Sequence, residues 1–563
     1  MSAPEERITG RWWAEGDTPV HADSRVTYLV DGRAAMLTMC IHFLKARRYI
    51  YTANWGITTT MDLVRGTDQR AGPDGSPQQE MLLSELRAEG LQEADIAFWM
   101  TQELSLQNVL HYVVSKGVEV RSLLWECPEI FSHYNPKQAQ EQLTQVGVIC
   151  LLDDSSRGIL HHPAESLHQK IAVVDGLYAF VGGIDLLIEA GDDFDRWDTH
   201  SHPFQSHLRS LHPPKSPHPW HDAHSLLEGP IAGDVEFNFR QRWNDVVQRH
   251  KLDASLLVPE HPSAPGMPSK TLAQVARTIP QHTYSFDPPS GIQGIAQLYG
   301  HALSNVERFL YVENQYFWLR AYIGLDIPLV SIDSPDMEYN ILKVGEALKR
   351  GAMVTIVLPD HPNVGRAFTD AGLERLKKEA PEAVAQGHLQ VFCLATSMLD
   401  GPKARYRPIY VHAKVAIIDD LWATVGSGNL NNRGMRDDTE MNVATFDSHL
   451  AQGLRLMLWG EHLGLIHDDD LLILSRFLGS QPLHPQKRAR AEQVLPYLQQ
   501  LLGNPEDGIR LMRERAQENL QHFKAGELLV GHLLPYLTAQ EAKEYDLDFH
   551  EEHGWVEEEG AEV

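Results

Sequence analysis

The sequence predicts an α/β protein with two similar lobes, each a mixed β-sheet flanked by helices, related by a pseudo-twofold duplication. The first observation is a repeated segment: HQKIAVVDGLYAFVGGID at 168–185 recurs as HAKVAIIDDLWATVGSGN at 412–429, at a constant offset of 244. The second is that a helical pattern, a glycine and an apolar strand follow one another in each half, as in α/β units. At 563 residues the chain is long enough for several domains.

The beginning of each half has the same order of elements. Residues 1–30 form a lead-in, and TYLVDG ends a short strand at Asp31-Gly32. A helix over 34–46 and a strand over 47–57 follow, and 295–317 repeats this helix and strand at an offset of 260. The residues matched at this offset are Arg48/Arg308, Tyr51/Tyr311 and Asn54/Asn314.

A second unit also occurs twice. The helix over roughly 101–115 passes through Lys116-Gly117 into an apolar strand, and its counterpart ends at Arg350-Gly351 before AMVTIVLP. Prolines are frequent over 258–290, which predicts a linker between the lobes. We therefore expect a first lobe at 1–257, a linker at 258–290, a second lobe at 291–465, and a helical cap with an acidic tail at 466–563.

The repeated segment predicts a site for phosphate chemistry. In a strand, His168 and Lys170 point to the same face, so an imidazole and an ammonium group converge, as do His412 and Lys414. Lysine supplies a compact positive charge for phosphoryl oxygens, and histidine can act as a nucleophile or a general acid. The glycines that follow leave room for a bulky anionic ligand.

These residues resemble the double signature of the phospholipase D superfamily. DRWDTHSHP (195–203), PWHDAHS (219–225), YVENQYF (311–317) and GSGNLNNRGMRDDTEMNV (426–443) are similar to segments of its eukaryotic-type catalytic core. The resemblance covers about residues 20–465 and implies the two-lobed phospholipase D fold.

The resemblance also implies roles for the residues. His168 is expected to attack phosphorus and His412 to act as acid and base, although the near-symmetry of the repeats leaves the reverse assignment open. Lys170 and Lys414 would bind the non-bridging oxygens, and Asn429 could donate a further hydrogen bond. Its counterpart Asp185 cannot donate when ionised, so the half-sites differ.

Several carboxylates are candidates for supporting roles. Asp175 and Asp419 lie five residues beyond the lysines, on the opposite strand face, so we interpret them as structural. Each histidine needs an acceptor that fixes its tautomer, and the candidates are Asp198 and Glu440; the family suggests that this pairing crosses between repeats. His221 and Asp222 resemble a family segment that borders the site, which suggests a supporting structural role.

Seven histidines lie within 200–224, which raises the alternative of a metal cluster. Prolines interrupt the regular spacing that a helical metal site would use, so a loop beside the active site is favoured. Four dispersed cysteines give no ligand spacing for zinc. We expect neither a metal nor a cofactor.

Charge and hydropathy limit the partners. A formal net charge of −27 opposes tight binding to nucleic acid, so a superfamily nuclease is disfavoured. The most apolar stretch, 171–188, contains Asp175 and Asp185 and is not a spanning helix. The amino terminus has no apolar signal region, so we expect a cytoplasmic protein with peripheral membrane contact at most. The apolar stretch 316–330 is one candidate for that contact, with a buried loop as the alternative.

The resemblance implies a phospholipase D. Such an enzyme cleaves the distal phosphodiester of a glycerophospholipid, for example phosphatidylcholine, at a membrane or micelle surface. The products are phosphatidic acid and the head-group alcohol, through a phosphohistidine that alcohols can intercept. The alternatives are a phosphatidyltransferase of the cardiolipin synthase type and an inactive lipid-binding scaffold; both intact repeats argue against the scaffold.

Overall fold

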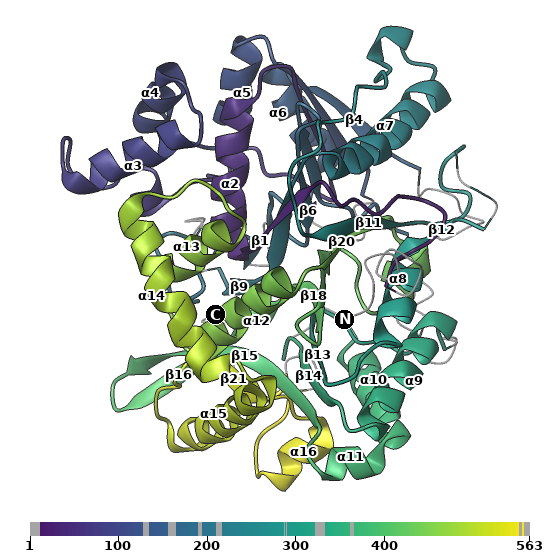
Figure 1. The fold of residues 1–563 in the computed structure, drawn as a ribbon, viewed down its shortest axis with the longest axis vertical. Helices are drawn as coiled ribbons and strands as arrows, with labels where there is room; N and C mark the ends of the chain where they lie inside the picture. The colour runs from purple at the N-terminus through teal and green to yellow at the C-terminus, as the bar shows by residue number, and fades with distance from the viewer. Residues whose placement is uncertain are drawn as a thin grey trace.

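Two β-sheets form the centre of the molecule in a computed structural model, one sheet in each lobe (Figure 1). The structure describes residues 12–127, 134–155, 165–189, 194–209, 217–286, 288, 290–320, 333–360, 365–550 and 554–556.

The first sheet has seven strands. In spatial order they are β1 (Arg25–Val30), β10 (Ala223–Glu228), β6 (Tyr178–Gly182), β5 (Ile171–Val174), β2 (Tyr49–Asn54), β3 (Glu119–Trp125) and β4 (Ile149–Asp153). β2, β3 and β4 are parallel, whereas β5, β6, β10 and β1 continue antiparallel from β2. The sheet is therefore mixed, as the sequence predicts.

The second sheet repeats this order and adds strands at its edges. The sequence of strands is β12 (Ile292–Gln293), β11 (Leu272–Ile279), β20 (Glu440–Phe446), β19 (Trp422–Gly426), β18 (Lys414–Ile418), β13 (Phe309–Asn314), β14 (Met353–Val357), β15 (Leu389–Asp400) and β16 (Lys403–Pro408), and β21 (Leu533–Pro535) pairs with β15. In spatial order, the seven strands from β11 through β20, β19, β18, β13 and β14 to β15 correspond one by one to the seven strands of the first sheet. The register also agrees, because Ile50 pairs with Val174 as Leu310 pairs with Ile418. The duplication seen in the sequence is a duplication of the fold.

Short strand pairs complete the set. They are β7 (Ile188–Glu189) with β8 (Phe194–Asp195), and β9 (Trp220–His221) with β17 (Tyr410–Val411). The β9–β17 pair joins one lobe to the other, because β9 belongs to the first half of the chain and β17 to the second.

Helices cover both sheets. In the first lobe they are α2 (Asp31–Lys45), α3 (Pro77–Ala88), α4 (Glu93–Thr101), α5 (Leu106–Ser115), α6 (Pro136–Gln145) and α7 (Ile231–Arg249); in the second lobe they are α8 (Gly294–Leu303), α9 (Pro335–Lys349), α10 (Arg366–Glu379), α11 (Pro381–Ala385) and α12 (Ser448–His462). Short helical turns lie at Gly66–Asp68, Ala254–Leu256 and Arg433–Asp437.

The predicted helix, glycine and strand units are present in both lobes. The C-cap residues of α5 and α9 are Lys116 and Arg350, and the following Gly117 and Gly351 have φ of 86° and 96°. Side chains other than glycine rarely adopt this left-handed conformation, so glycine is the residue that lets the chain turn back into β3 and β14.

One hydrophobic core runs through both lobes. It includes Val181 and Ile171 from the first sheet and Val415, Val425 and Val443 from the second, all buried. Since apolar burial supplies most of the stabilisation of a fold, the two lobes are held together by a common interior rather than by a linker.

The stretch predicted as a linker needs correction. Within 258–290, residues Leu272–Ile279 form β11, which lies between β12 and β20 in the second sheet. The prolines that suggested a linker end at Pro268 and resume at Pro280, so they bracket this strand. The second sheet therefore begins earlier in the chain than residue 291.

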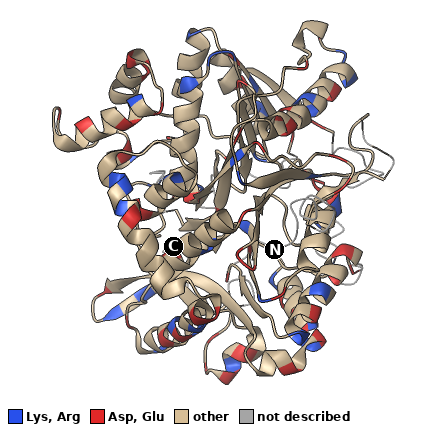
Figure 2. Cartoon of the chain, in the orientation of Figure 1, with Lys and Arg blue, Asp and Glu red and all other residues tan. Residues whose placement is uncertain are grey.

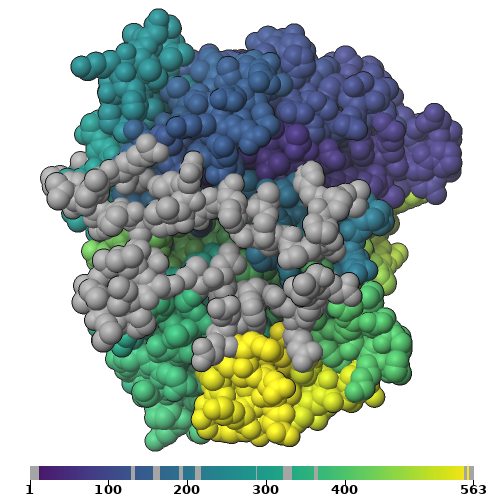
Figure 3. Space-filling view, turned by 180° about the vertical axis from the view of Figure 1, so that it is seen from behind, coloured from purple at the N-terminus to yellow at the C-terminus, as the bar shows by residue number. Residues whose placement is uncertain are grey.

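The region after residue 465 is mainly helical, with α13 (Asp468–Leu478), α14 (Pro485–Leu502), α15 (Pro505–Ala525) and α16 (Ala539–Glu544). α13 and α14 run along one side of the molecule, and α15 and α16 lie at the base of the second lobe (Figure 1). The same arrangement appears from behind, where the purple and blue first lobe lies above the green second lobe and the yellow end of the chain (Figure 3). β21 makes this region part of the second sheet as well as a covering layer.

Charged residues concentrate on the outer helices, where acidic and basic segments alternate (Figure 2). Among the described residues, the helices all fall short of the length and apolar character needed to cross a bilayer.

Candidate active site

The two repeated segments form equivalent hairpins at the centre of the sheets. β5 turns into β6 at Asp175, and β18 turns into β19 at Asp419; both aspartates have a φ of 55°. Aspartate tolerates this left-handed turn better than most residues because its short side chain can bind nearby backbone groups.

Asp175 and Asp419 bind backbone, as strand geometry predicts. The Asp175 carboxylate accepts hydrogen bonds from the N–H groups of Arg47, Arg48 and Tyr49 at 2.7–3.0 Å. The Asp419 carboxylate accepts from Glu307, Arg308 and Phe309 at 2.8–2.9 Å. Each aspartate thus ties its hairpin to the start of the neighbouring strand, β2 or β13.

His168 and His412 face each other across the boundary between the lobes. Their ring centroids are 6.4 Å apart and the rings are inclined by 62°. The side chains are 16% and 10% exposed, so both remain accessible to a ligand. Two imidazoles at this separation leave room for one phosphoryl group between them.

His168 is held by a carboxylate from the other repeat. Its Nδ1 lies 2.9 and 3.0 Å from the two carboxylate oxygens of Glu440, and Ser427 donates its hydroxyl to the same carboxylate at 2.5 Å. Burial raises the pKa of Glu440 to about 8. Burial, followed by the charges of Lys170 and Lys414, lowers the pKa of His168 well below its ordinary value, which favours the neutral, nucleophilic ring.

His412 is held by a carboxylate from the first repeat. Its Nδ1 lies 2.7 Å from Asp222 Oδ2, and the Trp220 ring packs beside it at 4.8 Å between centroids. Burial raises the pKa of Asp222 and lowers that of His412. The prediction that the carboxylates cross between repeats therefore agrees with the geometry at both histidines.

Backbone hydrogen bonds also join each histidine to the other repeat. The His168 N–H donates to the carbonyl of Thr439 at 3.0 Å, and the His412 N–H donates to that of His221 at 2.8 Å. Thr439 and His221 directly precede Glu440 and Asp222, so each backbone bond positions the carboxylate beside its histidine.

Asp198 is not the acceptor for either histidine, which corrects the sequence prediction. Its carboxylate accepts from Arg209 and from the Trp220 N–H at 3.0 Å each, and lies 3.0 Å from His202 Nδ1. Burial by itself would raise the pKa of Asp198, but the interactions with Arg209 and His202 outweigh it and lower this pKa to about 2. The carboxylate that serves His412 is Asp222, for which the sequence suggested only a supporting structural role.

A sequence signal for Asp222 exists. Gly182 pairs with His224 and Gly426 pairs with Asn442, and Asp222 and Glu440 lie two residues before these partners. Asp222 and Glu440 are therefore equivalent positions in the duplicated sheet. Matching the strands that follow the repeated segment would have identified the pair.

The lysines occupy equivalent but chemically different surroundings. Lys170 Nζ donates to the His168 carbonyl at 2.7 Å and lies 3.2 Å from Asp185. Lys414 Nζ donates to the His412 carbonyl and, at 3.1 Å, to Gln315 Oε1. Burial lowers the pKa of Lys414 to about 7.

Asn429 and Gln315 complete the second half-site. Asn429 Nδ2 donates to Gln315 Oε1 at 3.2 Å, so Gln315 links Asn429 to Lys414. Gln315 was not predicted as a site residue, although it belongs to the YVENQYF segment. In the first half-site Asp185 stands where Asn429 does in the second, so one lysine has an ionisable partner and the other has neutral partners.

The proposed membrane-docking segment 316–330 is only partly described. Trp318 is 3% exposed, packs on Phe368 and donates its ring N–H to Thr369 at 3.1 Å. Residues 321–330 lie outside the described residues. Trp318 is a core residue, which favours the buried-loop alternative for the start of this segment.

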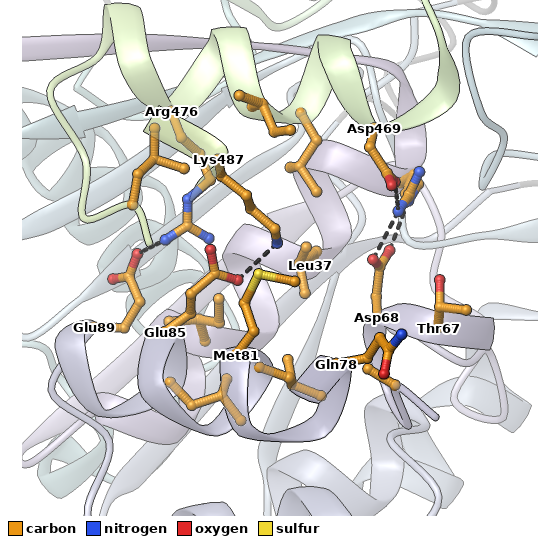
Figure 4. A pocket seen from close by; sticks show the side chains of 18 of the residues that line it. Leu37, Thr67, Asp68, Gln78, Met81, Glu85, Glu89, Asp469, Arg476 and Lys487 are labelled. Atoms are coloured by element: carbon orange, nitrogen blue, oxygen red, sulfur yellow. Dashed lines mark hydrogen bonds and ion pairs between the residues drawn. The ribbon is translucent and has the colours of Figure 1, made fainter. Parts of the chain in front are cut away.

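A separate cavity of about 270 Å³ lies between α2, α3 and the C-terminal helices α13 and α14 (Figure 4). None of the predicted site residues lines it. Its charged side chains are paired across the cavity: Arg476 with Glu89, and Lys487 with Glu85 at 2.7 Å. These pairs attach the C-terminal helices to the first lobe.

Comparisons with known proteins identify the family of the chain. A family model described as phospholipase D matches residues 42–323, and one described as cardiolipin synthase, phospholipase D-like domain, matches 325–458. Phospholipase D alpha 1 of Nicotiana tabacum is 26% identical over 547 residues, with 76% of this chain and 63% of that protein covered. Phospholipase D alpha 2 of Oryza sativa subsp. japonica is 27% identical, with the same coverage. The chain thus spans about 63% of the length of these curated relatives.

Solved structures give weaker matches. The phosphatidylserine synthase of Haemophilus influenzae Rd KW20 aligns with a TM-score of 0.44 at 15% identity, covering 82% of this chain and 90% of that one. Nuc of Salmonella typhimurium, described as a phospholipase D family member, aligns with a TM-score of 0.21 at 16% identity, covering 33% of this chain and 90% of that one.

Proposed function

Because the chain belongs to the phospholipase D family, we propose that it cleaves the distal phosphodiester of glycerophospholipids by a double displacement on histidine. The products are phosphatidic acid and the head-group alcohol. The single observation that carries the proposal is the pair of facing imidazoles, each with its Nδ1 on a carboxylate from the other repeat.

In the first step, the Nε2 of His168 attacks phosphorus and the bond to the head-group oxygen breaks. When Glu440 is ionised, its carboxylate accepts the Nδ1–H of His168, which leaves Nε2 free as the nucleophile; because the pKa of Glu440 is raised to about 8, we expect this form to prevail at mildly alkaline pH. His412 gives its proton to the departing oxygen, and the product is a phosphatidyl-histidine together with a free alcohol.

In the second step, His412 takes a proton from water, whose oxygen attacks phosphorus and breaks the P–N bond. His168 is then regenerated and phosphatidic acid is released. Lys170 and Lys414 stabilise charge on the non-bridging oxygens in both steps. A phosphodiester anion between the rings raises the pKa of His412, so binding of the substrate supplies the protonation that an acid requires.

A substrate with an activated leaving group shows which histidine is the nucleophile and which is the general acid. A p-nitrophenyl phosphodiester leaves without protonation, so His412→Ala should release p-nitrophenol once per chain and accumulate a phosphorylated His168 peptide, which mass spectrometry identifies. His168→Ala should release none. A covalent adduct on His412 in His168→Ala would reverse the roles, and substantial turnover of phosphatidylcholine by either variant would refute the mechanism.

A phosphatidyltransferase is the second candidate, because the cardiolipin synthase model matches residues 325–458. It shares the first step and differs in the acceptor, a lipid alcohol in place of water. Incubation with phosphatidylglycerol vesicles separates the two: a transferase forms cardiolipin and releases glycerol, whereas the proposed hydrolase forms mainly phosphatidic acid.

The net charge of −27 supports lipid over nucleic acid as the substrate, since a polyphosphate chain is repelled by an acidic surface. Peripheral contact with a membrane or micelle surface and a cytoplasmic location remain predictions. Faster cleavage of single-stranded DNA than of phosphatidylcholine vesicles would overturn the lipid assignment.

A further inference from the structure

The cavity between the first lobe and the C-terminal helices is large for an ordinary packing void. Its volume of about 270 Å³ is about nine times the roughly 30 Å³ that one water molecule occupies in the liquid, whereas protein interiors hold few voids larger than a single water. The same volume lies near the lower limit, about 300 Å³, of sites that bind small molecules. His168 and His412 do not line the cavity, so it is separate from the proposed active site.

The middle of the cavity is apolar. Leu37 and Ile41 of α2, Leu86 of α3 and Leu472 of α13 line it, and these side chains are 2–7% exposed. Figure 4 shows Leu37 and Met81 between two groups of charged side chains. Apolar walls hydrate poorly and gain free energy when an alkyl chain covers them.

One end of the cavity has an excess of positive charge. Arg476 and Lys45 both pair with Glu89. Lys487 pairs with Glu85. Among the described residues, these ion pairs contain three cations for two carboxylates, so one more negative charge would balance them.

The donors at this end have capacity for a further acceptor. Arg476 is 9% exposed, and in the described part of the chain its Nε is buried without a hydrogen-bond acceptor. Lys487 Nζ donates to Glu85 at 2.7 Å, and an ammonium group can donate three hydrogen bonds in all. A buried N–H without an acceptor is costly. An anionic group placed here would receive charge-assisted hydrogen bonds from both side chains.

The opposite end has the reverse balance of charge. Arg33 pairs there with Asp68 at 2.6 Å and with Asp469 at 2.8 Å, so one cation meets two carboxylates. A second anionic group is therefore disfavoured at this end. Gln78 lies beside Asp68 and is exposed, so a chain longer than the cavity can leave here (Figure 4).

We propose that this cavity binds one single-chain amphiphile with an anionic head, the chemistry that fatty acids and alkyl phosphates share. The head would bind Arg476 and Lys487, and the alkyl chain would lie along Leu37, Ile41 and Leu472. A phospholipid with two acyl chains exceeds the volume. The bound molecule would join α2 and α3 of the first lobe to α13 and α14, and its binding does not depend on the reaction proposed above.

Calorimetric titration of the full-length protein with fatty acids below their micelle concentrations tests the site. One molecule should bind per chain. The affinity should rise about fourfold for each methylene from hexanoate to decanoate, as expected for burial of a methylene, and should level off once the chain is longer than the cavity. The binding enthalpy should become more negative with temperature, which is the mark of apolar burial.

The head group is tested with chains of equal length. Decanoate and decyl phosphate should both bind, and the tighter of the two identifies the head that the site prefers. Decanol and decyltrimethylammonium should bind about tenfold more weakly or less, because neither gives the cationic end a charged acceptor.

Variants locate the site. Met81→Trp fills the cavity and should abolish binding of decanoate, and Lys487→Gln should weaken it about tenfold. Arg488→Gln is the matched control, because Arg488 is the next residue of α14 but is exposed and does not line the cavity. It removes the same charge and should leave the affinity unchanged. Near-UV circular dichroism shows whether each variant folds, and Lys487→Gln tests the site should Met81→Trp not fold.

Three results would overturn the site. The first is the lack of saturable binding at every chain length, or an affinity that does not change with chain length. The second is a folded Met81→Trp or Lys487→Gln that binds decanoate as wild type does, which places the ligand elsewhere. The third is binding of decyltrimethylammonium that is as tight as that of decanoate, which excludes recognition of an anionic head.

Discussion

His168 and Glu440 lie 272 positions apart in the chain, yet the imidazole Nδ1 of one is 2.9 Å from a carboxylate oxygen of the other. We expect Glu440→Gln to lower kcat about 10²–10⁴-fold, because an amide cannot stabilise the cationic ring that forms as His168 attacks. Steady-state hydrolysis of phosphatidylcholine measures the loss. Unchanged kcat in a folded variant would exclude Glu440 as the partner of the nucleophile.

Asp222 and Asp198 form a matched pair for the second histidine. Asp222→Asn should reduce kcat about 10²-fold, since Asp222 holds the His412 ring. Asp198→Asn should instead lower thermal stability, because Asp198 neutralises the buried Arg209 at 3.0 Å. Larger loss of kcat in Asp198→Asn than in Asp222→Asn would restore Asp198 as the catalytic partner.

The raised pKa of Glu440 also predicts how stability changes with pH. The folded protein holds this proton up to about pH 8, whereas the unfolded chain loses it near pH 4.5. Between these values the folded state binds more protons, so the free energy of unfolding contributed by this group falls as pH rises. Relative to Glu440→Gln, wild type should lose about 3 kcal/mol between pH 5 and pH 8 in urea unfolding. A difference that is constant with pH would contradict the raised pKa.

Asp419 should matter chiefly for stability. Asp419→Ala removes an acceptor from three backbone N–H groups, so we expect about 2–4 kcal/mol less free energy of unfolding. Asp400→Ala is the control, because the Asp400 side chain is 61% exposed and its pair with Arg405 is long; we expect a change within about 0.5 kcal/mol. Equal effects of the two substitutions would show that the backbone bonds of Asp419 contribute nothing measurable.

A covalent phosphatidyl-histidine should be open to capture by small alcohols. Hydrolysis of phosphatidylcholine in the presence of ethanol should yield phosphatidylethanol, identified by its mass, and its share should rise with ethanol concentration. Phosphatidic acid as the exclusive product at high ethanol would argue against an intermediate that alcohol can reach.

The sequence predicted what depends on local pattern. His168 and Lys170 immediately precede β5, and Asp175 ends it, so their spacing along one short segment was enough to predict that the first two belong to the site and that the third has a structural role. Asp222 was undervalued because its proximity to His412 is set by the β9–β17 pairing between lobes, and only a match of the strands that follow the two repeats would have indicated it. β11 was missed because prolines flank it on both sides.

The exchange of carboxylates between the repeats makes each lobe incomplete without the other. The arrangement is that of a symmetric dimer joined into a single polypeptide. Because the two halves are joined, their half-sites can differ in sequence. In a true homodimer both half-sites must carry the same residue at each position, whereas here Asp185 faces one lysine, and the other is bound by Gln315, which Asn429 contacts in turn. Fusion of the halves is what permits two histidines of common descent to specialise for different steps of one reaction.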